Sequence, residues 1–335
     1  MLEVRNLKTY FRTRAGYAHA VDDVSFTIQP GENLGLVGES GCGKTTAAKS
    51  IINLLPPNGQ IMSGQITFND RDLVKLTQAE MQTVRWKEIS MISQSAMNSL
   101  DPVYRVGDQI IEAIQSHEST GRSEALERSR ELFRLVGIDP KRLNDYPHQF
   151  SGGMKQRSII AMSLALNPGL IIADEPTTAL DVIVQDQILR RISSLLESRG
   201  ASMILITHDI SVVAEMCDRV VVMYAGKVME LGHVIDVFKH PFHPYTLGLK
   251  NAFPSIHGAK QELISIPGSP PKLVNPPSGC RFAARCPFAL PICREQEPTM
   301  AEVGPNHGAA CHRLNVIEMM RAEATKKENW DRVGE

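Results

Sequence analysis

Hydrophobic positions follow two periodicities that alternate from the start of the chain to about residue 232. Short apolar runs rich in β-branched residues predict buried strands, and the clearest of these span residues 33–37, 89–93, 170–173, 202–206 and 220–224. Apolar residues at helical spacing predict amphipathic helices at 123–135 and 183–197. The alternation predicts an α/β core with a buried, largely parallel sheet.

The pattern changes after about His240, where eight prolines between 241 and 277 interrupt any long helix or central strand. We therefore expect a second, loop-rich module there. The last stretch, 315–335, is charged and carries no recognisable motif, so we expect a solvated or frayed terminus.

Composition narrows the class of protein. The chain has 335 residues and a formal net charge of -1, which gives no global electrostatic reason to expect nucleic acid as the main partner. The longest apolar runs fall far short of the ~20 residues that a membrane helix needs, and the N-terminus lacks a signal-peptide pattern. We expect a cytoplasmic protein whose cysteines form no structural disulfides.

A glycine-rich segment between the strand at 33–37 and a helical pattern fits the phosphate-loop motif G-x-x-x-x-G-K-[ST]. Its glycines would turn backbone N–H groups toward phosphates, Lys44 would reach the β- and γ-phosphates, and Thr45 would ligate magnesium. We read Cys42 as a small side chain whose amide matters more than its sulfur. The predicted ATP-binding residues here are Gly38, Ser40, Gly41, Cys42, Gly43, Lys44, Thr45 and Thr46.

Carboxylates end the apolar strand at 170–173 and complete the chemistry of a nucleotide site. Asp174 would hold Mg²⁺, and Glu175 would act as the general base that polarises the attacking water. His208 follows the strand at 202–206 and would contact the γ-phosphate, the alternative being a histidine that caps the next helix. Gln94 follows the strand at 89–93 and would touch both magnesium and water, although a lone Gln is a weak signal.

The segment Phe150-Ser-Gly-Gly-Met-Lys-Gln-Arg157 lies upstream of these carboxylates, and with it the chain resembles the ATP-binding-cassette (ABC) ATPases. The family usually has Leu-Ser-Gly-Gly-Gln, so Phe150 and Met154 depart from it at the two outer positions. A Ser-Gly-Gly segment at a helix N-terminus is a second anion-binding surface. Because the chain already has a phosphate loop, this signature is expected to serve another chain.

What the resemblance implies is a head-to-tail pair of cassettes, each ATP lying between one phosphate loop and the other chain's signature. It also implies an aromatic residue that stacks on adenine, which we place at Phe11, with Tyr10 as a substitute. The alternative is that both aromatic residues pack in the core of a first strand. The remaining implied contacts are Ser151, Gly152 and Gly153 across the pair and Asp181, in the segment 179–181, at its seam. The resemblance covers residues 1–250, with a helical subdomain at about 95–160.

Residues 240–246 are similar to the His-Pro-Tyr segment that opens the C-terminal extension of dipeptide and oligopeptide importer ATPases. This likeness implies ATP-driven peptide uptake, with nickel or oligosaccharide import as alternatives within the subfamily. It also implies two membrane-spanning permease subunits, with the region between 94 and 151 gripping a cytoplasmic helix of the permease. An external binding protein and a place on the cytoplasmic face of the membrane are implied as well. The extension is expected to span 251–335.

Four cysteines of the extension, Cys280, Cys286, Cys293 and Cys311, are separated by five, six and seventeen residues. Four thiolates suit either tetrahedral zinc or an iron–sulfur cluster, and the absence of closely spaced pairs favours the cluster modestly. Peptide-importer ATPases are similar in carrying four such cysteines around a [4Fe-4S] cluster. We therefore expect that cluster, with zinc second and free thiols third.

Rival functions fit the sequence less well. A soluble cassette ATPase of DNA repair or translation usually has two cassettes in one chain or a long coiled coil, and this chain shows one phosphate loop and no sustained heptads. An exporter subunit is opposed by the importer-like extension. An iron–sulfur redox module with a degenerate nucleotide site is the third rival, and ATP turnover distinguishes it.

Overall fold

The computed structural model describes residues 1–93, 99–177, 181–252 and 264–333. Within these ranges the chain forms two compact units. The first contains Met1–Ile28, Leu34–Val74 and Thr207–Glu335, and the second contains Gln29–Asn33 and Lys75–Ile206. Among the helices of the described ranges, none has the length and apolar character needed to cross a membrane.

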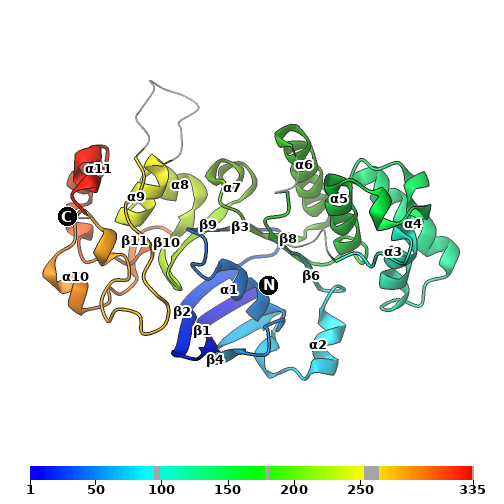
Figure 1. The fold of residues 1–335 in the computed structure, drawn as a ribbon, viewed down its shortest axis with the longest axis horizontal. Helices are drawn as coiled ribbons and strands as arrows, with labels where there is room; N and C mark the ends of the chain where they lie inside the picture. Colours follow the sequence, from blue (N-terminus) through cyan, green and yellow to red (C-terminus); the bar gives the residue numbers. More distant parts are fainter. Residues whose placement is uncertain (94–98, 178–180, 253–263, 334–335) are drawn as a thin grey trace. The chain divides into compact units, whose positions relative to one another are not determined.

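An antiparallel sheet opens the first unit, with strand order β2-β1-β4-β5. Its strands are β1 (Leu2–Thr13), β2 (Gly16–Ile28), β4 (Gly59–Phe68) and β5 (Arg71–Asp72). In β1, Leu2, Val4 and Leu7 are buried while Arg5 and Asn6 are exposed, which is the pattern of a half-buried antiparallel strand. Helix α1 (Lys44–Ile51) lies against β1 and β2 (Figure 1).

The first unit also contains strands in the order β11-β12-β10-β9-β3. They are β3 (Asn33–Val37), β9 (Arg219–Tyr224), β10 (Lys227–His233), β11 (Ala301–Gly304) and β12 (His307–Ala309). β3 and β9 are parallel, whereas β9, β10, β12 and β11 pair in antiparallel fashion. The extension thus contributes two strands that pair onward from β10. The helices of this unit, besides α1, are α7 (Ile210–Met216), α8 (Val234–Lys239), α9 (Pro244–Asn251), α10 (Pro291–Glu295), α11 (Ile317–Ala324) and α12 (Lys327–Asp331).

Three parallel strands, β6 (Ile89–Ile92), β7 (Leu170–Asp174) and β8 (Ser202–Ile206), form the sheet of the second unit in the order β8-β7-β6. Every residue of β7 and β8 is buried, as expected for parallel strands covered on both faces. Helices α3, α4 and α5 pack against one another (Figure 1). The helices are α2 (Gln78–Val84), α3 (Val106–Gln115), α4 (Arg122–Leu135), α5 (Gly152–Ser163) and α6 (Val182–Arg199).

The sequence predicted an α/β core, and this is confirmed. The antiparallel sheet of β1, β2 and β4 was not specified by the prediction of a largely parallel sheet. The expectation of a frayed C-terminus was wrong over the residues described there: Trp330 is 0% exposed and its indole N–H donates to the Ala324 carbonyl at 2.9 Å. A side chain at Gly248 would meet the Trp330 ring at 2.7 Å, so this glycine makes room for the indole.

Candidate functional site

The phosphate loop joins β3 to α1 in a conformation that requires glycine at two positions. Gly38 has φ of 145° and Gly43 has φ of 108°, a region that side-chain-bearing residues rarely adopt. A Cβ at Gly38 would lie 2.1 Å from the Met223 carbonyl oxygen, and one at Gly43 would lie 2.1 Å from that of Ala20. The loop is therefore seated tightly on β9 and β2, with its tip at Ser40 and Gly41 exposed.

Lys44 begins α1 and is 8% exposed. Its ammonium group donates to the carbonyl oxygens of Gly38 at 2.6 Å and of Glu39 at 3.0 Å. Thr45 and Thr46 follow on the first turn of the helix. Because the first N–H groups of a helix have no intrahelical partner, the start of α1 presents donors and a lysine to an anion.

Cys42 is 2% exposed, and burial raises the pKa of its thiol. Its amide donates to the Glu39 carbonyl at 3.2 Å, and its own carbonyl accepts the Gly226 amide at 2.8 Å. Its sulfur also accepts the Lys44 ammonium at 3.5 Å, so both the backbone and the side chain of Cys42 contribute bonds within this loop. Cys217 is likewise a buried free thiol, at the end of α7.

In the second unit, Asp174 is the last residue of β7 and is 2% exposed. Glu175 follows it with φ of 49°, and its amide donates to the Ile206 carbonyl of β8 at 2.8 Å. A left-handed conformation at a residue with a side chain costs on the order of 1 kcal/mol and is often found at functional sites. The sheet therefore fixes the direction in which Glu175 leaves β7.

His208 lies in the first unit, exposed, two residues after β8 ends. The alternative that it caps the next helix is excluded, because the cap of α7 is Asp209, whose carboxylate accepts the Ser211 amide at 2.9 Å. Gln94, and the seam residues Ala179 and Leu180, fall outside the described residues.

The signature segment opens α5. Ser151 is its N-cap, and the hydroxyl accepts the Met154 amide at 3.3 Å. Ser151 and Gly152 are exposed and Gly153 is half-buried. Phe150 is buried and meets Phe133 edge to face at 6.5 Å, so the larger aromatic residue is accommodated as a packing anchor. Asp181 is exposed and caps α6, its carboxylate accepting the Val184 amide at 3.0 Å.

Tyr10 and Phe11 are neighbours in β1, and both are half-buried. The Tyr10 hydroxyl donates to Asp22 at 2.8 Å, and its ring stacks on His19 with centroids 4.0 Å apart. The Phe11 ring lies over Gly59 of β4, where a Cβ would approach it to 2.6 Å. Tyr10 thus has a hydrogen-bonded and stacked side chain within its own unit, whereas the Phe11 ring packs on the backbone of β4.

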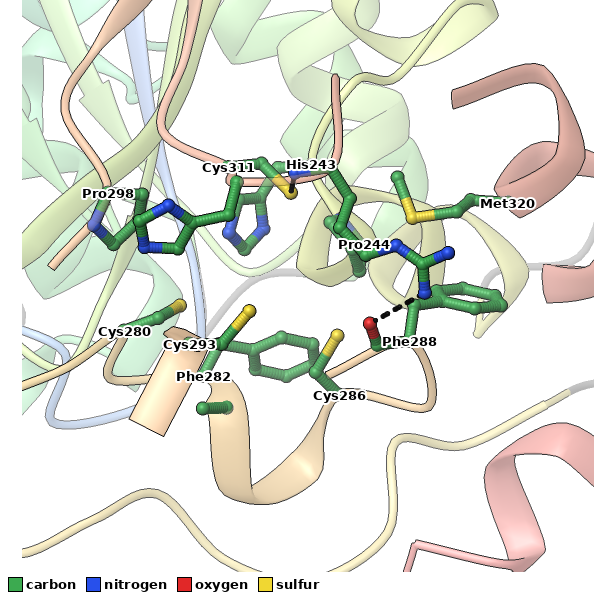
Figure 2. A pocket seen from close by; sticks show the side chains of 13 residues that line it. His243, Pro244, Cys280, Phe282, Cys286, Phe288, Cys293, Pro298, Cys311 and Met320 are labelled. Carbon is green, nitrogen blue, oxygen red and sulfur yellow. Dashed lines mark hydrogen bonds between the residues drawn. The ribbon is translucent and has the colours of Figure 1, made fainter. Parts of the chain in front are cut away.

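All four cysteines of the extension line one small cavity. Figure 2 shows the sulfurs of Cys280, Cys286 and Cys293 directed toward Cys311 and the His243 ring across the cavity. Burial raises the pKa of Cys280 to about 11 and also raises those of Cys286 and Cys311. His243 is 1% exposed and is a lining residue that sequence reasoning missed, although its His-Pro motif had been noticed.

Backbone N–H groups surround the cavity. The Leu290 amide donates to the Cys293 sulfur at 3.4 Å, and the Arg313 amide donates to the Cys311 sulfur at 3.4 Å. Within the described ranges, however, no three His, Cys, Asp or Glu side chains converge closely enough to ligate a single metal ion.

A glycine loop ahead of a helix, a strand ending in paired carboxylates and a Ser-Gly-Gly cap define a nucleotide-binding α/β protein of the cassette type. The family model "ABC transporter" matches residues 21–178, and "Oligopeptide/dipeptide transporter, C-terminal region" matches 229–293. The chain belongs to the ATP-binding proteins of ABC transporters, as the similarity of full-length relatives shows.

One such relative is a probable peptide ABC transporter ATP-binding protein of Sinorhizobium fredii, 50% identical over 95% of this chain and 96% of its own. Another is the oligopeptide transport ATP-binding protein OppD of Bacillus subtilis, 49% identical over 92% of this chain and 87% of its own. Among solved structures, the dimeric ATP-binding cassette MJ0796 bound to ADP and Pi matches with a TM-score of 0.64 and 26% identity, covering 70% of this chain and 99% of that chain.

Proposed function

We propose that this chain is the ATP-hydrolysing subunit of an importer for dipeptides or oligopeptides. The observation that carries the proposal is the near full-length similarity to proteins named for oligopeptide and dipeptide transport, extension included. A cassette alone would leave the cargo open. The matched extension favours peptides over the cargoes of other cassette transporters.

In this proposal one ATP molecule is held by the phosphate loop and acted on by Asp174, the last residue of β7, and by Glu175, which follows it. Lys44 and the start of α1 bind the β- and γ-phosphates, and Phe11 stacks on adenine. Thr45, Asp174 and Gln94 offer the oxygen ligands that Mg²⁺ prefers, and the ion would supply charge neutralisation between the β- and γ-phosphates. Glu175 accepts the proton of the attacking water, and His208 contacts the γ-phosphate.

The partners follow from the same proposal. A second cassette, identical or related, would close on the first so that each nucleotide meets the other chain's Ser151, Gly152 and Gly153, with Asp181 at the seam. The exposure of Ser151 and Gly152 supports this, because a closed intramolecular site would bury them. The membrane-spanning subunits would dock on the helical region, where Val103 and Tyr104 are 70% and 58% exposed, and hold the chain at the cytoplasmic face of the membrane.

The decisive experiment replaces Glu175 with Gln in the full-length chain and compares MgATP binding with ATP turnover. We expect binding to persist and turnover to fall by about 10²-fold or more, because the amide cannot accept a proton. Glu197→Gln, at an exposed glutamate of α6, is the matched control and should hydrolyse ATP normally. Turnover that survives in Glu175→Gln would remove Glu175 from the role of base.

Cargo is tested in cells that express the chain with its permease subunits and binding protein. Uptake of labelled dipeptides and pentapeptides should depend on the chain and stop in the Glu175→Gln variant. Uptake of nickel or an oligosaccharide in place of peptides would contradict the peptide assignment while leaving the ATPase assignment intact.

We also propose that the four cysteines hold a [4Fe-4S] cluster. The four cysteines line one cavity, and backbone amides donate to the sulfurs of Cys293 and Cys311. Hydrogen bonds to the sulfurs are typical of iron–sulfur sites, and four thiolates are the ligand set that such a cluster takes. When bound, it would supply four iron–thiolate bonds that staple a loop-rich segment.

The cluster is tested on anaerobically purified protein by iron and sulfide analysis. We expect about four irons per chain, and we expect Cys286→Ser to lower the iron content while Cys217→Ser, at a buried thiol outside the cavity, leaves it unchanged. Colourless protein that contains zinc would contradict the proposal.

A further inference from the structure

The cysteine-bearing segment reaches the phosphate loop through one arginine. Arg285 ends a short 3-10 turn (Ala283–Arg285), directly before Cys286. Its guanidinium donates to the Glu39 carboxylate at 2.7 Å and to the Tyr224 hydroxyl at 3.1 Å. It also donates to the carbonyls of Pro267 at 2.7 Å and Ile266 at 3.1 Å. The side chain is 7% exposed, and four bonds hold it in one orientation.

Glu39 is the second residue of the phosphate loop, and a second residue of the C-terminal part holds its backbone. The Glu39 amide donates to the Tyr245 hydroxyl at 2.8 Å. Tyr245 is 0% exposed, and burial raises the pKa of its hydroxyl well above the ordinary value, so the group stays neutral. Its ring packs against those of Tyr224 and Phe282, with centroids 4.7 Å and 5.3 Å away. These rings fix the position of the hydroxyl.

The third group of Glu39, its carbonyl oxygen, accepts the Lys44 ammonium at 3.0 Å. Amide, carboxylate and carbonyl are therefore each engaged, two of them by residues more than 200 positions away. The Arg285 guanidinium and the Glu39 carboxylate form a salt bridge at 2.7 Å, in which the arginine side chain is buried.

Charge explains why this arrangement matters for nucleotide. A carboxylate in a loop that binds a polyphosphate would repel it, and within a protein such a repulsion is stronger than in water. The ion pair with Arg285 draws the Glu39 carboxylate to the C-terminal segment and neutralises it. The Tyr245 bond fixes the loop at the same residue, so the carbonyl that steadies Lys44 keeps its place.

We infer that Arg285, together with Tyr245, positions the phosphate loop for nucleotide by holding Glu39, so that the cysteine-bearing segment sets the affinity of the site. Arg285 acts through Glu39 and does not touch the nucleotide. The inference rests on the proposed function, because it concerns the affinity for MgATP and MgADP.

The test measures MgATP and MgADP dissociation constants by calorimetry on the full-length chain. Arg285→Met should raise both dissociation constants by on the order of tenfold, because it frees the Glu39 carboxylate. Arg321→Met is the matched control: Arg321 also donates to two carbonyls, pairs with a glutamate and lies over an aromatic ring, all away from the loop. It should leave both constants within about twofold of the unmodified chain.

Rescue separates positioning from general support of the fold. Adding Glu39→Gln to Arg285→Met removes the unpaired charge and should restore most of the affinity, which a purely structural loss would not allow. Tyr245→Phe keeps the buried ring and removes the hydroxyl that accepts the Glu39 amide. It should weaken nucleotide binding by a few fold. It also provides a test should Arg285→Met fail to fold.

The inference is overturned if Arg285→Met binds nucleotide as the unmodified chain does, if Arg321→Met weakens binding equally, or if Glu39→Gln gives no rescue. In the event that Arg285→Met does not fold, unchanged affinity in Tyr245→Phe overturns it. An unmodified chain that binds no MgATP would instead overturn the proposed function.

Discussion

The chain contains two glycine-rich turns that each precede a helix and suit a phosphate, and they are built differently. The phosphate loop is seated on its own unit: Gly38 and Gly43 leave no room for a side chain, and Glu39 is held by Arg285 and Tyr245. The signature turn is open at its start, where Ser151 and Gly152 are exposed and the only bond of the serine side chain within the described residues is to the helix that it caps.

This difference shows what each turn is prepared for. A loop fixed by its own unit can bind a phosphate without further ordering, which is the preorganisation that electrostatic binding needs. An exposed turn gains its second contact only when another surface arrives. The comparison therefore predicts that substitutions in the phosphate loop impair nucleotide binding by the isolated chain. Substitutions in the signature should impair ATP turnover by the paired cassettes.

The largest effect should come from Lys44→Ala. Removing the ammonium group takes away a positive charge aimed at developing negative charge, and we expect turnover to fall by about 10²- to 10³-fold together with weaker MgATP binding. Lys49→Ala, on the last turn of the same helix, is the control and should keep both. Normal hydrolysis by Lys44→Ala would remove the phosphate loop from its assigned role.

A matched glycine pair tests the packing side of the comparison. Gly38→Ala places a Cβ against the Met223 carbonyl at a φ of 145°, so we expect the free energy of unfolding to fall by about 2 to 4 kcal/mol. Gly152→Ala adds a good helix former to the exposed first turn of α5 and should leave stability unchanged or raise it. Denaturant unfolding of both variants measures the two changes in the free energy of unfolding. Equal losses of stability would show that the two turns are equally confined.

The sequence was most informative where local pattern decides structure. The runs at 33–37 and 202–206 match β3 and β8 to the residue, because buried parallel strands are near-continuous apolar runs. The phosphate loop, the Asp174-Glu175 pair and the Ser151 cap were found in the same way, since spacing within a few residues carries their chemistry. The helix cap at Asp209, whose carboxylate accepts the Ser211 amide, excludes a capping role for His208, and this contact needed the structure.

Contacts between distant residues were beyond the pattern. Arg285 and Glu39 are 246 positions apart, and nothing in a proline-rich segment marks one arginine as the partner of a loop carboxylate. Trp330 stands alone in a charged stretch, so its burial against Gly248 has no periodicity to reveal it. The four cysteines were identified by count, but their meeting in one cavity depends on strands β11 and β12, which the sequence analysis did not predict.

Substitutions of Ser151 should have the smallest effect on stability, and they test directly whether the signature turn serves a second chain. Ser151→Ala removes the cap of α5 and should cost about 1 kcal/mol of stability, whereas Ser151→Asp keeps an acceptor for the Met154 amide and should keep the stability. In the paired, ATP-bound state the aspartate would face the partner's phosphates, so Ser151→Asp should also lower turnover while the isolated chain still binds MgATP. Thermal unfolding, calorimetry and turnover of the two variants separate these roles. If Ser151→Asp instead weakened MgATP binding by the isolated chain, the signature would serve its own nucleotide, and the distinction between the two turns would fail.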